Sequence, residues 1–405
     1  MNILIMNAHW NNRGDEAATR AMIDHLQDKY PDAKIKVLLL TSNIKQFRYD
    51  DVECRSNFYP RKRDLYFEVP LFVLSRGKLM FSKRGKEFCQ LIKEADIVIH
   101  APGGPSIGDI YFTDEIYYLY RMLIAKVLHK PYVFYAPSMG PFNTEKHKFR
   151  NALRRSILNG ASVFCVREPI SKKYIEKLGN VKLPTVTLDS AFQYPVNIEK
   201  NQQILNEYQE LRDFINQNEK IIGITITDLK WNPKYAQTSV SVNINDTFTK
   251  MIEYLNKLGY AVLFIPQLFG NQHDNKYMST FANEKCMVMS EDYDCYFQQF
   301  IISKMHALIG MRYHSNIFSA KMGCPFVSVA YEQKMSGFMK KIGLEEYCID
   351  INDLSFNLLK EKFSSLEKNY NSYKEVLVEK SVLLQKESSK TTELVCECIE
   401  SKVRK

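Results

Sequence analysis

The sequence predicts an α/β protein of two domains, each built on a parallel sheet with helices on both faces. Short apolar runs such as NILIMN, KIKVLLL and AVLFIPQ alternate with stretches whose apolar residues recur at helical spacing. This alternation is typical of parallel βα units. The chain of 405 residues is also too long for one ordinary core, and its length suggests two domains of about 150 to 200 residues each.

Composition agrees with a soluble globular protein, with 45% hydrophobic and 25% charged residues. The 55 Lys and Arg against 46 Asp and Glu leave a formal charge of +9, which favours anionic small molecules, lipid surfaces or nucleic acid. The basic residues are dispersed, and dense clusters occur only at residues 61–63, at 83–86 and in the terminal KVRK. Because the sequence contains no helix-turn-helix, zinc-finger or base-stacking pattern, we expect no nucleic-acid partner.

Cysteine usage and the amino terminus indicate a cytoplasmic protein. The nine cysteines include no CxxC pair, and many are embedded in apolar runs such as SVFCVR. We therefore expect reduced core cysteines and no metal site. The opening MNILIMNAHW lacks the features of a signal peptide and is predicted to be a first strand. The longest apolar stretch is broken by charged residues and Pro131, so we expect no membrane span.

The first domain is predicted over residues 1–200. After NILIMN come the loop AHWNNRGDE, a helix, the strand KIKVLLL, and an aromatic-rich insertion at residues 43–80 without a clear pattern. The strands IVIH, PYVFYA and SVFCVR follow, each preceded by a helical stretch, and PTVTLDSAF ends the domain. Loops after parallel strands meet at the carboxyl edge of the sheet, where such folds bind ligands.

Five polar residues of these loops are candidate site residues. They are Asn11, Asp15, Asp109, Arg167 and Asp189. The alternative for each aspartate is structural, since carboxylates in these positions also cap helices and turns.

The second domain is predicted over residues 215–365, after a polar stretch at 195–218 that contains the boundary. Its strands are predicted at KIIGITIT, AVLFIPQ, CMVMS, HALIG and FVSVAY. The polar, helical segment 366–405 is predicted to cross back to the first domain. Two such domains with a cleft between facing carboxyl edges form the GT-B arrangement, so we expect a GT-B-like fold.

The stretch after HALIG concentrates cationic residues at this edge. Arg312 and His314 are predicted to lie in an exposed turn between a strand and a helix, and FVSVAY leads to Lys334 in a second turn. Together they predict an anion site, with Arg167 on the opposite wall of the cleft. The alternatives are a structural pair between Arg312 and Glu332, and a His314 that only begins a helix.

Seven motifs, in this order, resemble the polysaccharide pyruvyl transferase family over residues 3–350. They are NNRGDEA, GGPSIGD, SMGPF, VREPISKKYIEKLG, TLDSAF, IPQLFGNQHDN, and the long segment that begins GMRYHSNIFSAKMGCPFVSVAYEQK. The resemblance implies a GT-B-like fold and transfer of a pyruvyl group from phosphoenolpyruvate to sugar hydroxyls. The expected product is a ketal on a cell-surface polysaccharide or its lipid-linked precursor, with phosphoenolpyruvate as co-substrate and no cofactor.

The resemblance also implies roles for individual residues. Arg312, Lys334 and Arg167 would bind the donor, and His314 would transfer protons. From their positions in the strand-end loops, and not from the resemblance, Asp15 and Asp189 are expected as catalytic carboxylates, with Asp109 and Asn11 binding substrate. The chain departs from the family in APSM before GPF and in Gln267 after Pro266, two differences that concern the acceptor.

Two other functions fit the same fold: a glycosyltransferase that uses a nucleotide sugar, and an inactive glycan-binding protein. Peripheral association with the inner face of the membrane and homo-oligomerisation are both compatible with the sequence. It does not identify the sugar, the hydroxyls that react, or the choice between a ketal and a single ether.

Overall fold

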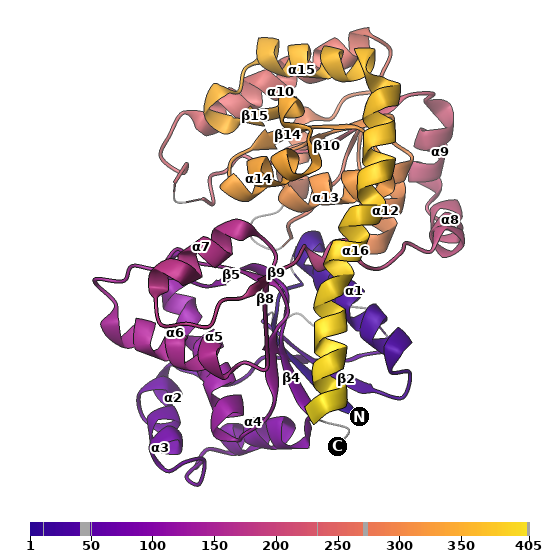
Figure 1. Ribbon diagram of the computed structural model, residues 1–405. Coiled ribbons are helices and arrows are strands. Elements are labelled where there is room, and N and C mark those ends of the chain that lie inside the picture. The colour runs from indigo at the N-terminus through magenta and orange to yellow at the C-terminus, as the bar shows by residue number, and fades with distance from the viewer. Residues whose placement is uncertain (11, 41–48, 50, 233, 270–273, 403–405) are drawn as a thin grey trace. The chain divides into compact units, whose positions relative to one another are not determined.

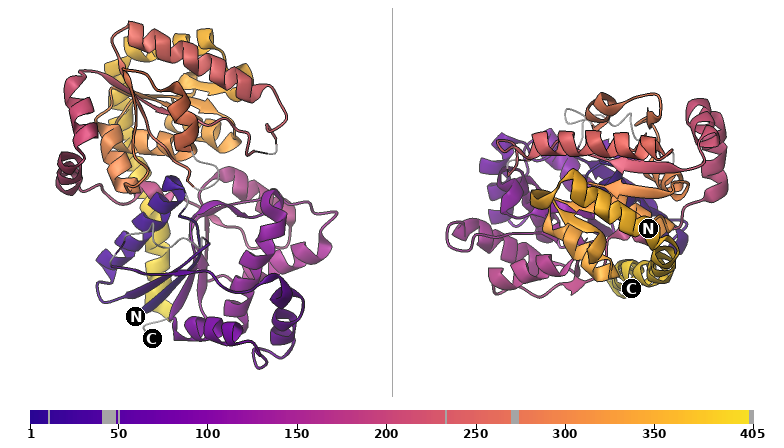
Figure 2. Two further views of the ribbon diagram at one scale, coloured as in Figure 1. Left: turned by 180° about the vertical axis from the view of Figure 1, so that it is seen from behind. Right: turned by 90° about the horizontal axis from the view of Figure 1, so that it is seen from above.

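The computed structural model describes residues 1–10, 12–40, 49, 51–232, 234–269 and 274–402. The chain forms two compact units (Figure 1). Unit 1 comprises Met1–Trp10, Asp15–Tyr194 and Gln385–Lys405, and unit 2 comprises Asn11–Gly14 and Pro195–Leu384. Helices cover both faces of the sheet in each unit (Figure 2). The predicted pair of parallel-sheet α/β domains is therefore confirmed.

Unit 1 contains a seven-stranded sheet in the order β3-β2-β1-β4-β6-β8-β9, and all neighbouring strands are parallel. From β1 to β3 each new strand is added on one side of β1, whereas β4 and the later strands are added on its other side. A topological switch point therefore lies between β1 and β4. A separate parallel pair, β5 and β7, lies outside this sheet. The strand bounds are β1 (Asn2–Ala8), β2 (Lys34–Leu39), β3 (Glu53–Ser56), β4 (Ile97–His100), β5 (Gly103–Ile107), β6 (Tyr132–Phe134), β7 (Pro137–Met139), β8 (Val163–Val166) and β9 (Thr185–Val186).

The helices of unit 1 pack on both faces because residues along each strand alternate in direction. In β1, Leu4 and Met6 belong to one core cluster, whereas Ile3 and Ile5 belong to the other. The helices are α1 (Arg13–Lys29), whose first two residues belong to unit 2, α2 (Lys62–Tyr66), α3 (Glu68–Leu74), α4 (Lys83–Glu94), η2 (Asp109–Tyr111), α5 (Phe112–Val127), α6 (Lys148–Gly160), α7 (Pro169–Leu178) and η3 (Ser190–Phe192).

Unit 2 contains a six-stranded parallel sheet in the order β12-β11-β10-β13-β14-β15. Its strands are β10 (Ile221–Thr225), β11 (Ala261–Phe264), β12 (Cys286–Val288), β13 (Ala307–Gly310), β14 (Phe326–Ala330) and β15 (Cys348–Asp350). Its helices are α8 (Ile198–Glu207), α9 (Gln209–Gln217), α10 (Val240–Lys257), α11 (Asp274–Met278), η4 (Ser279–Phe281), α12 (Cys295–Ser303), α13 (Tyr313–Met322), α14 (Gln333–Ile342), η5 (Glu345–Tyr347), η6 (Ile351–Asp353) and α15 (Phe356–Lys368).

The last helix, α16 (Tyr370–Lys402), is shared by the two units, because residues from Gln385 onward belong to unit 1 (Figure 1). In unit 2, the Tyr373 hydroxyl donates to the Phe326 carbonyl oxygen at 2.6 Å. In unit 1, the Ser388 hydroxyl donates to the Asp189 carbonyl oxygen at 2.6 Å. Buried hydroxyls thus anchor both ends, and the predicted helix that crosses back to the first domain is confirmed.

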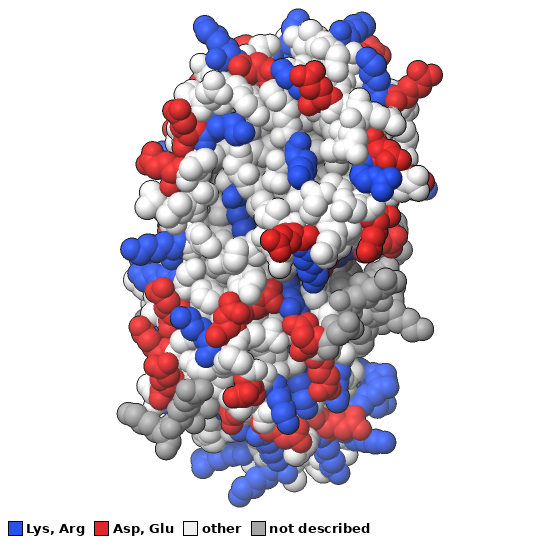
Figure 3. Space-filling model, turned by 90° about the vertical axis from the view of Figure 1, so that its right-hand side faces the viewer, with Lys and Arg blue, Asp and Glu red and all other residues white. Residues whose placement is uncertain are grey.

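The surface charges are mixed on the face shown in Figure 3, where Lys and Arg side chains alternate with Asp and Glu side chains. Within the described ranges, no helix combines the length and the apolar character that a membrane span requires. All nine cysteines are free thiols, and five of them are buried.

His100 ends β4 and is held neutral in the core, with 1% of its surface exposed. Its Nδ1 lies 2.9 Å from the Ala101 carbonyl oxygen, which is an acceptor, so Nδ1 bears the proton. The Nε2 atom then accepts from the Ser106 hydroxyl at 3.1 Å. Burial lowers the pKa of His100 from 6.5 to about 4, because a charged imidazolium would be poorly solvated there.

This lowered pKa predicts that acid destabilises unit 1. The stability linked to His100 is fully present above pH 6.5, which is the pKa of this residue in the unfolded chain. It is lost as the pH falls toward about 4, the pKa in the folded protein. Between about pH 7.5 and pH 4.5, the loss linked to this residue is about 2 to 3 kcal/mol. Urea unfolding of wild type and His100→Asn at the two pH values measures it. Equal acid dependence of the two proteins would contradict the assignment.

Candidate functional site

Two helix N-termini lie at the carboxyl edge of the unit 2 sheet. Strands β13 and β14 are parallel neighbours, and each is followed by a helix, α13 and α14 respectively. Neither N-cap residue, Arg312 or Glu332, caps its helix with its side chain. The backbone N–H groups of a first helical turn lack partners within the helix and carry the positive end of its dipole. This edge is therefore suited to bind an anion.

Arg312 is buried at this edge, not exposed as predicted, with 7% of its surface accessible. Its guanidinium group donates two hydrogen bonds to the Asp274 carboxylate and lies over the Trp231 ring, 5.3 Å from the centroid. Burial alone would lower the pKa of Arg312, but the Asp274 carboxylate outweighs it and raises that pKa. The side chain therefore stays charged. The alternative in which Arg312 pairs with Glu332 is wrong, because Arg312 pairs with Asp274 instead.

Asp274 organises the neighbouring loop as well. Its Oδ2 atom accepts from the backbone N–H groups of Gln267 and Leu268, both at 3.0 Å. One carboxylate thus joins the chain after β11 to the N-terminus of α13.

His314 is also buried, with 6% of its surface exposed. It lies in the first turn of α13, which begins at Tyr313. Its ring centroid lies 5.1 Å from that of Tyr313. The backbone of Gly14 lies so close that a Cβ atom there would be 1.9 Å from Nδ1 of His314. Glycine is therefore required at position 14 for this approach.

Several contacts hold the described residues before Gly14 in unit 2. Asn12 forms an antiparallel bridge with Leu268, the Arg13 amide donates to the Gln267 carbonyl oxygen at 2.9 Å, and the Arg13 guanidinium lies over the Phe269 ring at 4.4 Å. Residues 12–14 therefore approach His314. Asn11, predicted to bind substrate, lies outside the described residues.

Lys334 lies in the first turn of α14, where its Nζ is 2.7 Å from the Glu332 carboxylate and 5.4 Å from the centroid of the Tyr313 ring. Tyr313 thus contacts both Lys334 and His314. Each of the two permanent cations, Arg312 and Lys334, is matched by one carboxylate. The positive potential for a ligand therefore depends strongly on the helix N-termini, a feature that counting charges in the sequence overlooks.

The start of α13 is fixed by buried hydroxyl and amide groups. The Ser315 hydroxyl donates to the Arg312 carbonyl oxygen at 2.7 Å and contacts the Thr225 hydroxyl of β10 at 2.7 Å. The Asn316 amide donates to the Ser328 hydroxyl of β14 at 2.7 Å. These contacts tie α13 to two strands and limit its movement when an anion binds.

In unit 1, Arg167 and Asp189 form a buried pair, with Nη1 2.5 Å from Oδ2. Arg167 also donates to the Ser138 hydroxyl at 2.8 Å. Asp189 accepts from the Ala191 amide at 3.0 Å and caps η3, as the structural alternative proposed. The expectation that Arg167 lies opposite Arg312 stays a prediction.

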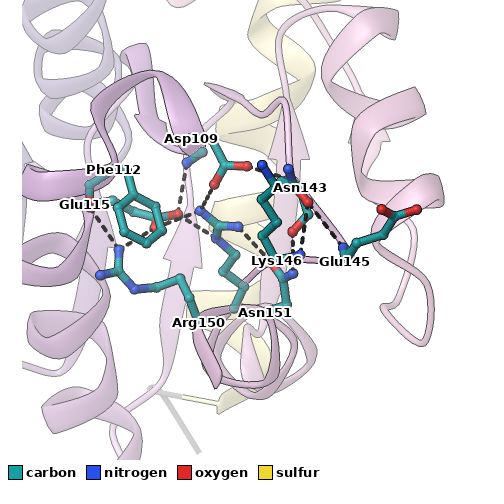
Figure 4. A network of polar contacts seen from close by, with 10 residues as sticks. Asp109, Phe112, Glu115, Asn143, Glu145, Lys146, Arg150 and Asn151 are labelled. Carbon is teal, nitrogen blue, oxygen red and sulfur yellow. Dashed lines mark hydrogen bonds and ion pairs between the residues drawn. The ribbon is translucent and has the colours of Figure 1, made fainter. Parts of the chain in front are cut away.

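Asp109 belongs to a network of polar contacts that also includes Glu115 and Arg150 (Figure 4). Arg154 pairs with Asp109 in this network. The fully buried Arg154 guanidinium lies 2.6 Å from Asp109 and 2.7 Å from Glu115, which also pairs with Arg150 at 2.7 Å. Asp109 additionally accepts from the Asn143 amide. The network joins the loops after β5 and β7, so these contacts give Asp109 a structural role.

Asp15 is partly exposed, and its Oδ1 accepts from the Gly104 amide at 3.2 Å. Gly103 has φ +133°, and a Cβ atom there would lie 2.9 Å from the same oxygen. His9 lies near Asp15. Burial lowers the pKa of His9, and this effect exceeds that of the Asp15 charge, which acts to raise the same pKa. Asp15 is thus the predicted carboxylate for which the structure gives no ion pair within the described residues.

Arg121 is a cation that the sequence reasoning missed. It lies in α5 with 5% of its surface exposed, donating to the Tyr59 carbonyl oxygen at 2.9 Å and to Asn7 Oδ1 at 3.0 Å. Within the described residues no carboxylate forms an ion pair with it, and burial lowers its pKa to about 10. The available signal is an arginine among the apolar residues of a predicted helix.

The comparisons with known proteins agree with this architecture. Residues 12–333 match the family described as polysaccharide pyruvyl transferase. The amylovoran biosynthesis protein AmsJ of Erwinia amylovora is 25% identical over 400 residues, which cover 91% of this chain and 93% of AmsJ.

Solved structures show the same fold at low sequence identity. A UDP-GlcNAc 2-epimerase from Neisseria meningitidis has a TM-score of 0.59 at 13% identity, covering 98% of this chain and 100% of its own. Anabaena Alr3699/HepE in complex with UDP has a TM-score of 0.58 at 12% identity, covering 99% and 100%. The GT-B-like fold predicted from the sequence is confirmed.

The Arg312–Asp274 pair leads to a stability prediction. Asp274→Asn leaves a buried guanidinium without its counter-charge and should lower the free energy of unfolding by about 3 kcal/mol or more. Asp246→Asn removes a carboxylate from an exposed pair with Lys250 and should change it by less than about 0.5 kcal/mol. Urea unfolding followed by circular dichroism compares the two. Equal stability of the two variants would show that the buried pair does not stabilise unit 2.

Proposed function

Because the chain belongs to the polysaccharide pyruvyl transferase family, we propose that it transfers the pyruvyl group of phosphoenolpyruvate to a sugar. The acceptor is a cell-surface polysaccharide or its lipid-linked precursor, and the product is a pyruvate ketal. The resemblance to a protein named for amylovoran biosynthesis supports a role in making a polysaccharide.

The observation on which the donor assignment rests is the pair of helix N-termini at the ends of β13 and β14, with Arg312, His314 and Lys334 in their first turns or caps. Phosphoenolpyruvate bears a phosphate and a carboxylate on adjacent atoms. Backbone amides of a helix's first turn bind one such group, and a guanidinium binds another through two parallel hydrogen bonds. Asp274 holds the Arg312 plane in one orientation, which suits this geometry.

The reaction needs both proton donation and proton removal. One sugar hydroxyl adds to the central carbon of phosphoenolpyruvate while the methylene carbon gains a proton. The C–O bond to phosphate breaks, and a second hydroxyl adds to the same carbon, so the products are the ketal and inorganic phosphate. His314, in the first turn of α13, is proposed to move a proton in these steps.

Unit 1 is proposed to supply the acceptor side. Asp15 is a better candidate for the base than Asp109 or Asp189, because those two are committed to ion pairs with Arg154 and Arg167. Arg121 and Asn7 lie at the carboxyl end of β1, where an acceptor that carries a phosphate would meet an uncompensated cation.

Substitutions in the donor site test the assignment. His314→Gln should lower kcat at least about 100-fold, because it removes a proton-transfer group. Lys334→Met should raise the KM for phosphoenolpyruvate, whereas Lys340→Met in the last turn of the same helix should change neither constant, since Lys340 is exposed and far from the N-terminus. Release of inorganic phosphate from phosphoenolpyruvate, with a panel of lipid-linked and synthetic glycosides as acceptors, measures kcat and KM for all three variants.

The competing outcomes are distinct. Full activity of His314→Gln would remove that residue from the mechanism. Release of a nucleoside diphosphate from a nucleotide sugar, with no phosphate from phosphoenolpyruvate, would replace pyruvyl transfer by glycosyl transfer.

A further inference from the structure

Unit 1 exposes an unusual group of large apolar side chains. Sixteen such side chains are exposed on the described residues, and six of them lie in one short segment. The six are Tyr66, Phe67, Leu71, Leu74, Leu79 and Phe81. Scattered exposed apolar residues are ordinary, but a concentration of them marks an interaction surface.

These side chains are not part of the core. In α2 and α3, Leu65, Val69 and Phe72 face inward and are at most 7% exposed. Phe67 and Leu74, between and beyond them, are 72% and 80% exposed. The core of this region is therefore already packed without the outward residues, and folding does not explain them.

The same segment is strongly basic. Residues 61–86 contain eight Lys and Arg, all of them exposed. They are Arg61, Lys62, Arg63, Arg76, Lys78, Lys83, Arg84 and Lys86. With two carboxylates, Asp64 and Glu68, the segment has a formal charge of 8 − 2 = +6, against +9 for the whole chain.

Both carboxylates are buried and accept hydrogen bonds from the segment itself or from the adjacent Tyr59. Asp64 accepts from the Arg61 amide at 2.8 Å. Glu68 accepts from the Phe81 amide at 2.8 Å, the Ser82 amide at 2.5 Å and the Tyr59 hydroxyl at 2.9 Å. These bonds hold α3 against the start of α4, so the cations and the apolar side chains are presented from a folded platform.

The two basic runs of the segment, 61–63 and 83–86, lie side by side. Arg61 and Arg84 line the same pocket of about 450 Å³, together with Asn57 and Glu87. Basic residues more than twenty positions apart in the sequence thus meet at one pocket. The segment lies at the end of unit 1 where α2, α3 and α4 are found (Figure 1).

We propose that residues 61–86 dock unit 1 on an anionic membrane surface. The Lys and Arg side chains attract anionic lipid headgroups, and Phe67, Leu74 and their apolar neighbours enter the interfacial layer. A second copy of this surface is a poor partner, because a symmetric contact would bring two such basic segments together. The proposal concerns a surface separate from the donor site, so it does not depend on the donor.

Flotation of the full chain with lipid vesicles tests the proposal. The protein should float with vesicles of phosphatidylcholine and phosphatidylglycerol, and should bind phosphatidylcholine alone far more weakly. Phe67→Ser with Leu74→Ser should lower the partition coefficient at least about tenfold. Lys62→Gln with Lys83→Gln and Lys86→Gln should lower it roughly a hundredfold at low salt.

Matched variants control for general effects. Leu183→Ser removes an exposed leucine of unit 1, and Lys257→Gln with Lys285→Gln and Lys360→Gln removes the same charge from exposed positions of unit 2. Both should float like wild type. Turnover of a water-soluble acceptor should be unchanged in every variant, which separates this proposal from the proposed function.

Three results would overturn the proposal. The first is that wild type does not float with anionic vesicles, and the second is that the matched variants lose as much binding as the segment variants. The third is a dimer in sedimentation equilibrium that Phe67→Ser with Leu74→Ser disrupts, without flotation of wild type. That result would assign the surface to a second copy of the chain.

Discussion

The buried ion pair between Arg312 and Asp274 is the interaction on which the candidate donor site depends. Asp274 holds the guanidinium group and two backbone amides of the chain after β11, and Arg312 is the N-cap of α13. A buried charge is costly unless it is paired and hydrogen-bonded. The same pair therefore stabilises unit 2 and orients the Arg312 guanidinium, a hydrogen-bond donor, at the N-terminus of α13.

Much of the fold could be predicted from sequence, because strand and helix periodicity and glycine helix ends are local properties. Gly323, for example, ends α13 in the left-handed conformation that glycine adopts most readily. The partners of charged residues could not be predicted in this way. Arg312 pairs with a residue 38 positions away, and the nearby carboxylate that seemed a partner, Glu332, pairs with Lys334. Tertiary contacts also bury Arg312 and His314 in a turn that the polar pattern indicated to be exposed.

The charged residues of unit 1 divide into two groups by their environment. Arg154 and Arg167 are buried with carboxylates and serve to hold loops together. Arg121 is buried with only neutral acceptors among the described residues. Keeping a buried arginine charged without a carboxylate costs free energy. For this reason, the end of β1 is the place where we propose that an anionic part of the acceptor binds.

The central proposal is that phosphoenolpyruvate binds at the N-termini of α13 and α14, and a structure of the chain with phosphoenolpyruvate bound tests it most directly. The account predicts phosphate and carboxylate oxygens within hydrogen-bonding distance of the first-turn amides of these helices and of Arg312. Phosphoenolpyruvate bound elsewhere, or a uridine nucleotide bound at these helix ends while phosphoenolpyruvate fails to bind, would contradict it.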